Sequence, residues 1–133
     1  MGTVVLDASV VLALFDAQDS LHEPASATAR RCRDQGDQFI LPASVLAEVL
    51  VGAAKRGEAE LTTRRRLAVA AFGTPYPADE EVAVAAARRR TRHRALRLPD
   101  ALVLATADAA GADAVLTGDK RWAGMDERVL VIQ

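Results

Sequence analysis

Short continuous runs of apolar and β-branched residues recur along the chain and alternate with longer segments of helical spacing. Such runs are typical of strands that are buried on both faces of a parallel sheet. Strands are predicted over residues 3–6, 38–42, 114–117 and 129–132, with a further, ambiguous one over residues 72–76. Pro42 is expected to end the second strand, because proline cannot extend the hydrogen-bond ladder.

The segments between these runs carry apolar residues at the spacing of amphipathic helices. Ser9 is expected to cap a helix through Leu14, and Pro24 to open a helix that runs to about Arg33, before Gly36. Further helices are predicted over residues 44–52, 57–71, 79–93 and from 100 or 101 to 110. Strands that alternate with helices predict a three-layer α/β domain, in which a parallel sheet of about five strands has helices on both faces.

Length and composition are those of one globular domain. The chain has 133 residues, of which 50% are hydrophobic and 26% charged, so we expect a single domain over residues 1–133. Asp7 and Asp16 interrupt the first apolar runs, which are too short for a signal or membrane segment. Cys32 is the only cysteine, which excludes an intrachain disulfide and a cysteine zinc site. These features favour a cytoplasmic protein.

Arginine is concentrated in one segment, although the formal net charge is only −1. Residues 88–97 contain six arginines and no acidic residue, whereas the only lysines of the chain are Lys55 and Lys120. Such a segment is either a solvated helix face or a surface that binds a polyanion. Charge alone leaves both alternatives open.

Four acidic residues stand where the predicted strands end or helices begin: Asp7, Glu48, Asp100 and Asp119. Ligand sites of parallel sheets lie beyond the carboxyl ends of the strands, so the four side chains can converge at one edge. Each aspartate taken alone can equally be a helix cap or a turn residue. A lone Glu48 beside an apolar helix face is harder to explain, because burial of an unpaired carboxylate is costly.

Convergence of these carboxylates would favour a bound cation. Their mutual repulsion would raise some of the pKa values and destabilise the fold unless a cation lay between them. A donor set of oxygen atoms alone suits Mg²⁺ or Mn²⁺ rather than Zn²⁺. One or two such ions can deprotonate water, neutralise a scissile phosphate and stabilise the leaving oxygen. The pattern therefore predicts a metal site for phosphate chemistry.

Four segments resemble the PIN-domain family in their order and spacing, and its small single-domain VapC toxins in particular. The segments are VLDASVV from Val5, SVLAEV from Ser44, LPDALVLATA from Leu98 and LTGDKRW from Leu116. The resemblance extends over residues 4–132. It implies an endoribonuclease that depends on Mg²⁺ or Mn²⁺ and acts as the toxin of a type II toxin–antitoxin pair.

The resemblance also implies roles for individual residues. It assigns the acidic quartet of the family to Asp7, Glu48, Asp100 and Asp119. Asp7 and Asp100 would be the most direct metal ligands, and the other two acids would complete the site, position water or hold a second ion. Ser9 and Thr117 match polar positions that support the first and last acids. Trp122 stands where the family often has Phe, and we expect it to pack against the rear wall of the site.

The partners that the resemblance implies are an RNA substrate, such as tRNA or ribosomal RNA, a small VapB-like antitoxin and a second copy of the chain in a homodimer. No membrane partner is expected. The arginine segment leads directly into Asp100, so Arg94 and Arg97 are predicted to bind RNA phosphates. The residues do not identify the RNA target.

Two other functions are alternatives. A receiver-like phosphoacceptor domain also has acids and a lysine at strand ends, but it requires a pair of acids after its first strand and a lysine after a separate one. Here Asp7 stands alone, and Lys120 directly follows Asp119. A catalytically silent PIN domain that binds nucleic acid or a partner is the second alternative, although all four acids are present.

Overall fold

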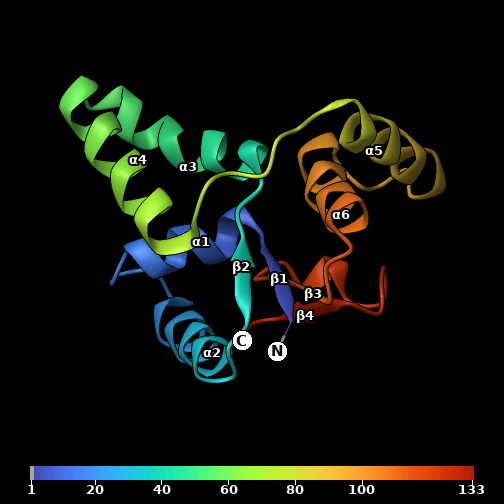
Figure 1. The fold of residues 1–133 in the computed structure, drawn as a ribbon, viewed down its shortest axis with the longest axis horizontal. Coiled ribbons are helices and arrows are strands. Elements are labelled where there is room, and N and C mark those ends of the chain that lie inside the picture. The colour runs from blue at the N-terminus through green and yellow to red at the C-terminus, as the bar shows by residue number, and fades with distance from the viewer. Residues whose placement is uncertain (1) are drawn as a thin grey trace.

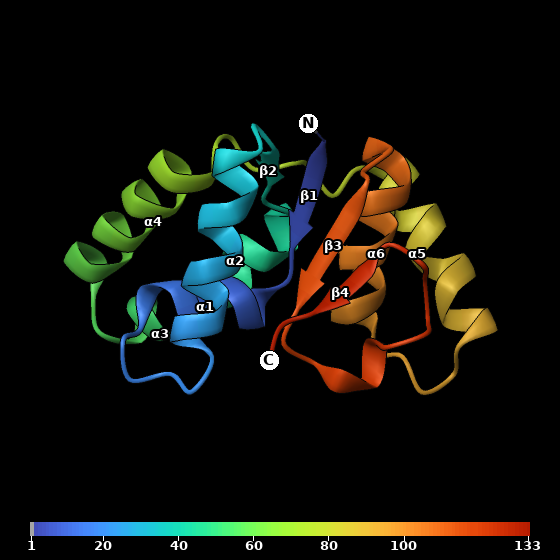
Figure 2. The same cartoon turned by 90° about the horizontal axis from the view of Figure 1, so that it is seen from below.

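Four parallel strands form the central sheet in the computed structural model, which describes residues 2–133. The strands are β1 (Thr3–Leu6), β2 (Gln38–Ile40), β3 (Ala114–Thr117) and β4 (Val129–Val131), and their order across the sheet is β2-β1-β3-β4. Leu6 pairs with Leu116 in β3, and Leu116 pairs with Leu130 in β4. Figure 2 shows β1 and β3 side by side and pointing the same way, so the residues that follow them meet at one edge.

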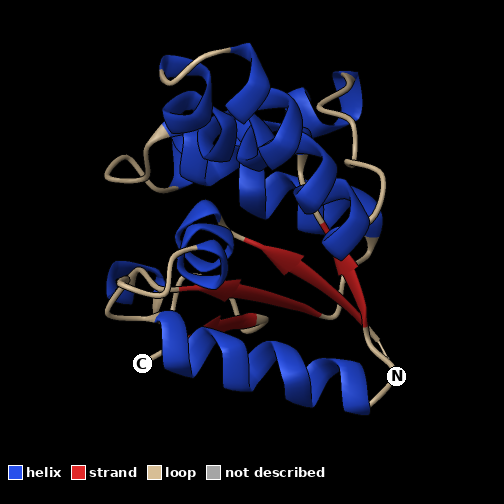
Figure 3. Ribbon diagram, turned by 90° about the vertical axis from the view of Figure 1, so that its left-hand side faces the viewer, coloured by secondary structure: helices blue, strands red, loops and turns tan. Residues whose placement is uncertain are grey.

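Helices cover both faces of this sheet (Figure 3). In residues 2–133 they are α1 (Ala8–Phe15), α2 (His22–Asp34), α3 (Ala43–Lys55), α4 (Glu58–Phe72), α5 (Glu80–Arg92), α6 (Leu98–Ala110) and the 3₁₀-helix η1 (Lys120–Trp122). Figure 1 shows the pair α3 and α4 on one side of the molecule and the pair α5 and α6 on the other. No helix in this part of the chain combines the length and apolar character needed to cross a membrane. The three-layer α/β class is confirmed.

Helix α6 is the central helix of the core and carries one of the candidate acids. Val103 and Leu104 are fully buried, as is Val115 on β3, which α6 contacts. Full burial of each such side chain stabilises the fold by roughly 1.5–3 kcal/mol. The helix ends at Gly111, whose φ of 62° is the left-handed conformation that glycine adopts without strain. The position of Asp100 is therefore fixed by a well-packed helix.

The predicted strand over residues 72–76 is wrong, and the sheet has four strands rather than about five. Helix α4 continues to Phe72, and Tyr76 makes only an isolated parallel bridge with Pro42. The ring of Phe72 packs edge-to-face against Phe15 and Phe39, with centroids 6.0 and 5.9 Å apart. The apolar residues of this segment thus bury the end of a helix instead of forming a ladder. Pro24 likewise lies within α2, which begins two residues earlier at His22.

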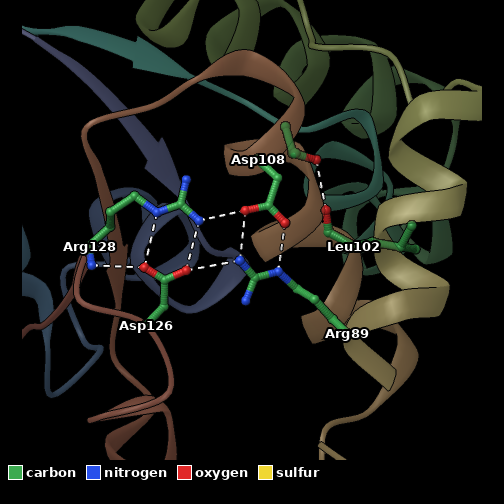
Figure 4. A network of polar contacts seen from close by, with 6 residues as sticks. Arg89, Leu102, Asp108, Asp126 and Arg128 are labelled. Atoms are coloured by element: carbon green, nitrogen blue, oxygen red, sulfur yellow. Dashed lines mark hydrogen bonds and ion pairs between the residues drawn. The ribbon is translucent and has the colours of Figure 1, made fainter. Parts of the chain in front are cut away.

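An ion-pair network fixes the α5–α6 hairpin to the segment that leads into β4 (Figure 4). Arg89 on α5 donates from Nε to Oδ2 of Asp108 on α6 at 2.8 Å, and from Nη2 to Oδ2 of Asp126 at 2.9 Å. Arg128 donates from Nη2 to Oδ1 of Asp108 at 2.6 Å and to Oδ2 of Asp126 at 2.7 Å. We call these four residues the Arg89 network. It links α6, which carries Asp100, to residues 118–128, which carry Asp119.

Candidate active site

Asp7 lies at the end of β1, where three hydrogen bonds fix its carboxylate. Oδ1 accepts from the backbone N–H of Ala8 at 2.8 Å, and Oδ2 accepts from the hydroxyls of Ser9 and Thr117, both at 2.8 Å. Asp7 is 8% exposed, so these donors replace much of its hydration. Asp7 is also the N-cap of α1, and the cap predicted at Ser9 is wrong, because the Ser9 hydroxyl is bound to Asp7.

Ser9 and Thr117 connect Asp7 to the chain that follows β3. The Ser9 hydroxyl accepts a hydrogen bond from the Gly118 N–H at 2.9 Å, and the Thr117 hydroxyl accepts one from the Asp119 N–H at 3.0 Å. A Cβ atom on residue 118 would lie 2.5 Å from Cδ1 of Leu21, so the Leu21 side chain would have to move to admit a larger residue. The two hydroxyls therefore set the position of Asp119 relative to Asp7.

The other three acids reach the same edge from α3, α6 and η1. Glu48 is exposed on α3, and Asp100 is in the first turn of α6. Loss of solvent around the carboxyl raises the pKa of Glu48, and the charges of Asp7 and Asp100 raise it further. Burial also raises the pKa of Asp100, and the charges of Asp7 and Asp119 add to this rise. The fold thus brings each of the four acids predicted from the sequence within electrostatic reach of at least one other.

Two arginines oppose this accumulation of negative charge. Arg121 donates from Nη2 to Oδ2 of Asp119 at 2.6 Å, and this hydrogen bond is the main reason that the pKa of Asp119 is lowered. Arg97 donates from Nε to Oδ2 of Asp100 at 3.4 Å. Arg121 is a residue of the site that the sequence analysis missed. Its only signal in the sequence is a basic residue two positions after an aspartate at a helix cap.

The donor chemistry of this edge fits a hard divalent cation. Asp7, Glu48, Asp100 and Asp119 offer carboxylate oxygens alone, the ligands that Mg²⁺ and Mn²⁺ prefer. Burial is the main cause of the raised pKa values of Glu48 and Asp100, and repulsion from neighbouring carboxylates, which a cation would relieve, adds to it. Over residues 2–133, no three His, Cys, Asp or Glu side chains are yet grouped closely enough to hold an ion. The residue types fit such an ion.

Comparison with known proteins identifies the family. The model of the PIN domain matches residues 4–128. The chain belongs to the PIN-domain family. No curated protein matches this PIN domain in sequence. The match also leaves the receiver-like alternative without support.

Solved structures share the fold of this PIN domain. A toxin–antitoxin complex from Klebsiella pneumoniae has a TM-score of 0.74 at 24% identity, and the match covers 96% of each chain. A VapBC complex from Rickettsia felis, bound to a DNA fragment from its promoter, has a TM-score of 0.75 at 11% identity over 97% of this chain and 96% of that one. A Sarcin-Ricin loop cleaving VapC toxin from Mycobacterium tuberculosis has a TM-score of 0.69 at 20% identity over 91% and 95%. The VapC-type fold is therefore shared along nearly the whole chain.

The arginine segment of the PIN domain divides into structural and exposed residues. Arg89 belongs to the Arg89 network, and Arg90 donates from Nη1 to the backbone carbonyls of Arg94 and Leu96 at 3.0 and 2.8 Å. These two arginines hold α5 and the loop that precedes α6. Arg94 is exposed on this loop, as is Arg97 immediately before α6. Arg88 and Arg92 are exposed as well, and Arg97 contacts Asp100, so the part of the segment that can reach a polyanion comprises Arg88, Arg92, Arg94 and Arg97.

A groove of about 650 Å³ adjoins Glu48 between α1, α3 and α4. Lys55, Arg56 and Arg64 line it together with Asp16, Asp19 and apolar side chains, and the Arg64 guanidinium lies 5.0 Å from the centroid of the Phe15 ring. The sequence does not indicate this groove, because its charged lining of both signs comes from α3, α4 and the loop after α1. Helical spacing does not indicate which residues of two helices share a groove. Trp122 is buried, and with Asp100 and Arg121 it lines a small cavity. Its role as the rear wall of the site stays a prediction.

Proposed function

We propose that this PIN domain is an endoribonuclease that depends on Mg²⁺ or Mn²⁺, with Asp7, Glu48, Asp100 and Asp119 as its active site. The observation that supports this function best is the convergence of four carboxylates that lie directly after β1, on α3, in the first turn of α6 and at the N-cap of η1. Membership of the PIN-domain family agrees with a nuclease. Repulsion between these acids adds to the effect of burial on the pKa values of Glu48 and Asp100, and a bound cation would offset it.

Each acid has a separate task in the proposed mechanism. Asp7 and Asp100 would hold the cation, because Asp7 is oriented by two hydroxyls and Asp100 is fixed by the buried helix α6. The bound ion supplies activation of water and neutralisation of the scissile phosphate. Glu48, as the exposed acid of the four, would orient the attacking water. Asp119 would complete the ligand set or help to hold a second ion.

The proposed biological role is the toxin of a toxin–antitoxin pair with a VapB-like antitoxin. Two of the structures that share the fold are a toxin–antitoxin complex and a VapBC complex, and a third is described as cleaving the Sarcin-Ricin loop. Ribosomal RNA is therefore the first substrate to test, and tRNA the second. The homodimer stays a prediction, which the molar mass in solution tests.

Cleavage of RNA in the presence of Mg²⁺ or Mn²⁺ tests the proposed function. We expect cleavage by the native protein, its loss in EDTA, and a decrease of at least about 100-fold for Asp7→Asn and Asp100→Asn. Asp34→Asn is the matched control, since Asp34 is exposed at the end of α2, close to the start of β2 and away from the site. Equal cleavage by all variants would overturn the proposed site. Binding of RNA without any cleavage would instead support a catalytically silent PIN domain.

A further inference from the structure

Two exposed arginines are bound to two of the four candidate carboxylates. Arg121 binds Asp119 through both carboxylate oxygens: Nε lies 3.0 Å from Oδ1 and 3.2 Å from Oδ2, and Nη2 lies 2.6 Å from Oδ2. Arg97 binds Asp100, with Nε 3.4 Å from Oδ2. The oxygen atoms that these guanidiniums occupy belong to the same set that would ligate a cation.

These pairs differ from those of the Arg89 network in the exposure of their arginines. The side chains of Arg97 and Arg121 are 68% and 70% exposed, whereas that of Arg89 is 13% exposed within its network. The carboxylates of the two pairs are largely buried, with Asp100 13% and Asp119 22% exposed. When a pair separates, water solvates the arginine fully, but the carboxylate is left without a counter-ion. Arg97 and Arg121 can therefore leave without disturbing the core, provided that another cation takes their place.

The field of both arginines extends beyond their direct partners. The charge of Arg97 opposes the rise in the pKa of Glu48 and of Asp100, and it also lowers the pKa of Asp119. Hydrogen bonding to Asp119 raises the pKa of Arg121, and the charge of Asp100 contributes to this rise. Each guanidinium thus interacts with more than one acid of the site.

We propose that Arg97 and Arg121 are exchangeable counter-ions of the carboxylate cluster, which neutralise Asp100 and Asp119 until a divalent cation displaces them. This inference rests on the proposed metal-dependent function and assigns the residues that set its cation affinity. A cation must compete with two guanidiniums for carboxylate oxygens, so the arginines weaken its binding. In return they limit the repulsion among the acids before the cation arrives.

Calorimetric titration of the intact protein with Mn²⁺ at pH 8 tests the competition. Removing one positive charge beside a doubly charged ion should tighten Mn²⁺ binding by about 3- to 10-fold in Arg97→Ala and in Arg121→Ala. Arg121→Lys, which keeps the charge but not the two-pronged contact, should lie between Arg121→Ala and the native protein. Arg92→Ala is the control, since Arg92 is exposed at the end of α5 and has no ion pair with any of residues 2–133.

A direct observation of the guanidiniums gives an independent test. In ¹⁵N NMR of the native protein, the Nε–H signal of Arg121 should shift as Mg²⁺ is added, because its carboxylate partner is withdrawn. The Arg90 signal should stay constant, since this side chain is bound to the backbone carbonyls of Arg94 and Leu96. A shift of the Ala8 amide signal would report Mg²⁺ binding at Asp7. If the Arg121 signal then stayed unchanged, displacement of Arg121 by the cation would be overturned.

The titrations also separate this inference from the proposed function. Native protein that binds Mn²⁺, together with arginine variants of equal or weaker affinity, would overturn the counter-ion role and leave the metal site intact. Absence of Mn²⁺ binding in the native protein and in every variant would overturn both. Tighter binding in Arg97→Ala and Arg121→Ala, with loss of binding in Asp7→Asn, supports both.

Discussion

The Thr117 hydroxyl donates a hydrogen bond of 2.8 Å to Oδ2 of Asp7, across a sequence separation of 110 residues. Asp7 directly follows β1, and Thr117 is the last residue of β3, which pairs with β1. Thr117 is completely buried. The same hydroxyl accepts from the backbone N–H of Asp119. One buried hydroxyl therefore joins the first and last acids of the candidate site.

Replacement of Thr117 by Val should destabilise the fold and disturb the site. The change preserves shape but leaves the Asp7 carboxylate and the Asp119 N–H each without one partner, so we expect a loss of about 1–3 kcal/mol in the free energy of unfolding. RNA cleavage should fall as well. Urea denaturation and cleavage rates measure the two effects, and Thr117→Ser, which keeps the hydroxyl, is the control. Native stability in Thr117→Val would contradict the assigned role.

Asp126→Asn should weaken the protein in a pH-dependent way. Hydrogen bonds from Arg128 lower the pKa of Asp126 most, and its side chain is only 11% exposed. A lowered folded-state pKa contributes stability above the unfolded pKa of about 4, and this contribution disappears as the pH falls towards the folded-state value. We expect a loss of about 3 kcal/mol at pH 7 and a smaller difference from the native protein at pH 3.

Urea denaturation at pH 7, 5 and 3 measures this dependence. The pKa of Asp108 is also lowered: burial would raise it, but hydrogen bonds from Arg89 and Arg128 outweigh burial. Asp108→Asn should therefore show the same trend. Asp34→Asn, at an exposed position on α2, should match the native protein at each pH. A difference that stays constant from pH 7 to pH 3 would show that ionisation of Asp126 is not its source.

Asp100→Asn should stabilise the fold when no divalent cation is available. Burial raises the pKa of Asp100, with contributions from Asp7 and Asp119, so its charged form is disfavoured in the folded protein. This penalty applies above the folded-state pKa and vanishes as the pH falls through it. At pH 7 in EDTA the variant should gain about 1 kcal/mol or less, because the pair with the exposed Arg97 that it loses is weak.

Addition of Mn²⁺ should reverse that order of stabilities. A cation that binds only the folded state raises its stability in proportion to the logarithm of its concentration over Kd. The native protein should therefore gain in Tm with Mn²⁺, and Asp100→Asn should not. Thermal unfolding in EDTA and in Mn²⁺ provides the comparison. If both proteins gain equally, Asp100 is not a ligand.

Replacement of Arg94 and Arg97 by Ala should weaken RNA binding and its salt dependence together. Each arginine lost from a single-stranded phosphate contact should reduce the slope of log K against log salt by about 0.7. Filter binding in the Asp7→Asn background prevents cleavage during the measurement. The matched control is Arg30→Ala with Arg31→Ala, two exposed arginines on α2. An unchanged slope would remove Arg94 and Arg97 from the RNA surface.

Local sequence determined the elements and the identity of the four acids. The runs that became β1 and β3 are apolar because their strands are covered on both faces, and Asp7 and Asp119 follow them because a parallel sheet places loops at that edge. The periodicity of apolar residues could not decide the secondary structure of residues 72–76, since a short apolar run is equally compatible with a strand and with a buried helix end. Packing of Phe72 against Phe15 and Phe39 favours the helix end.

Tertiary structure alone decided how the charged and polar side chains are paired. Ser9 is a good helix cap by residue type, but the hydroxyl contacts Asp7 and the segment after β3, so Asp7 caps α1 instead. Arg89 forms ion pairs with Asp108 and Asp126, while other arginines of the same segment are exposed to solvent. Such pairings depend on residues far apart in the chain. The sequence therefore determined which carboxylates could form a site. Only the fold decided which arginines and hydroxyls contact them.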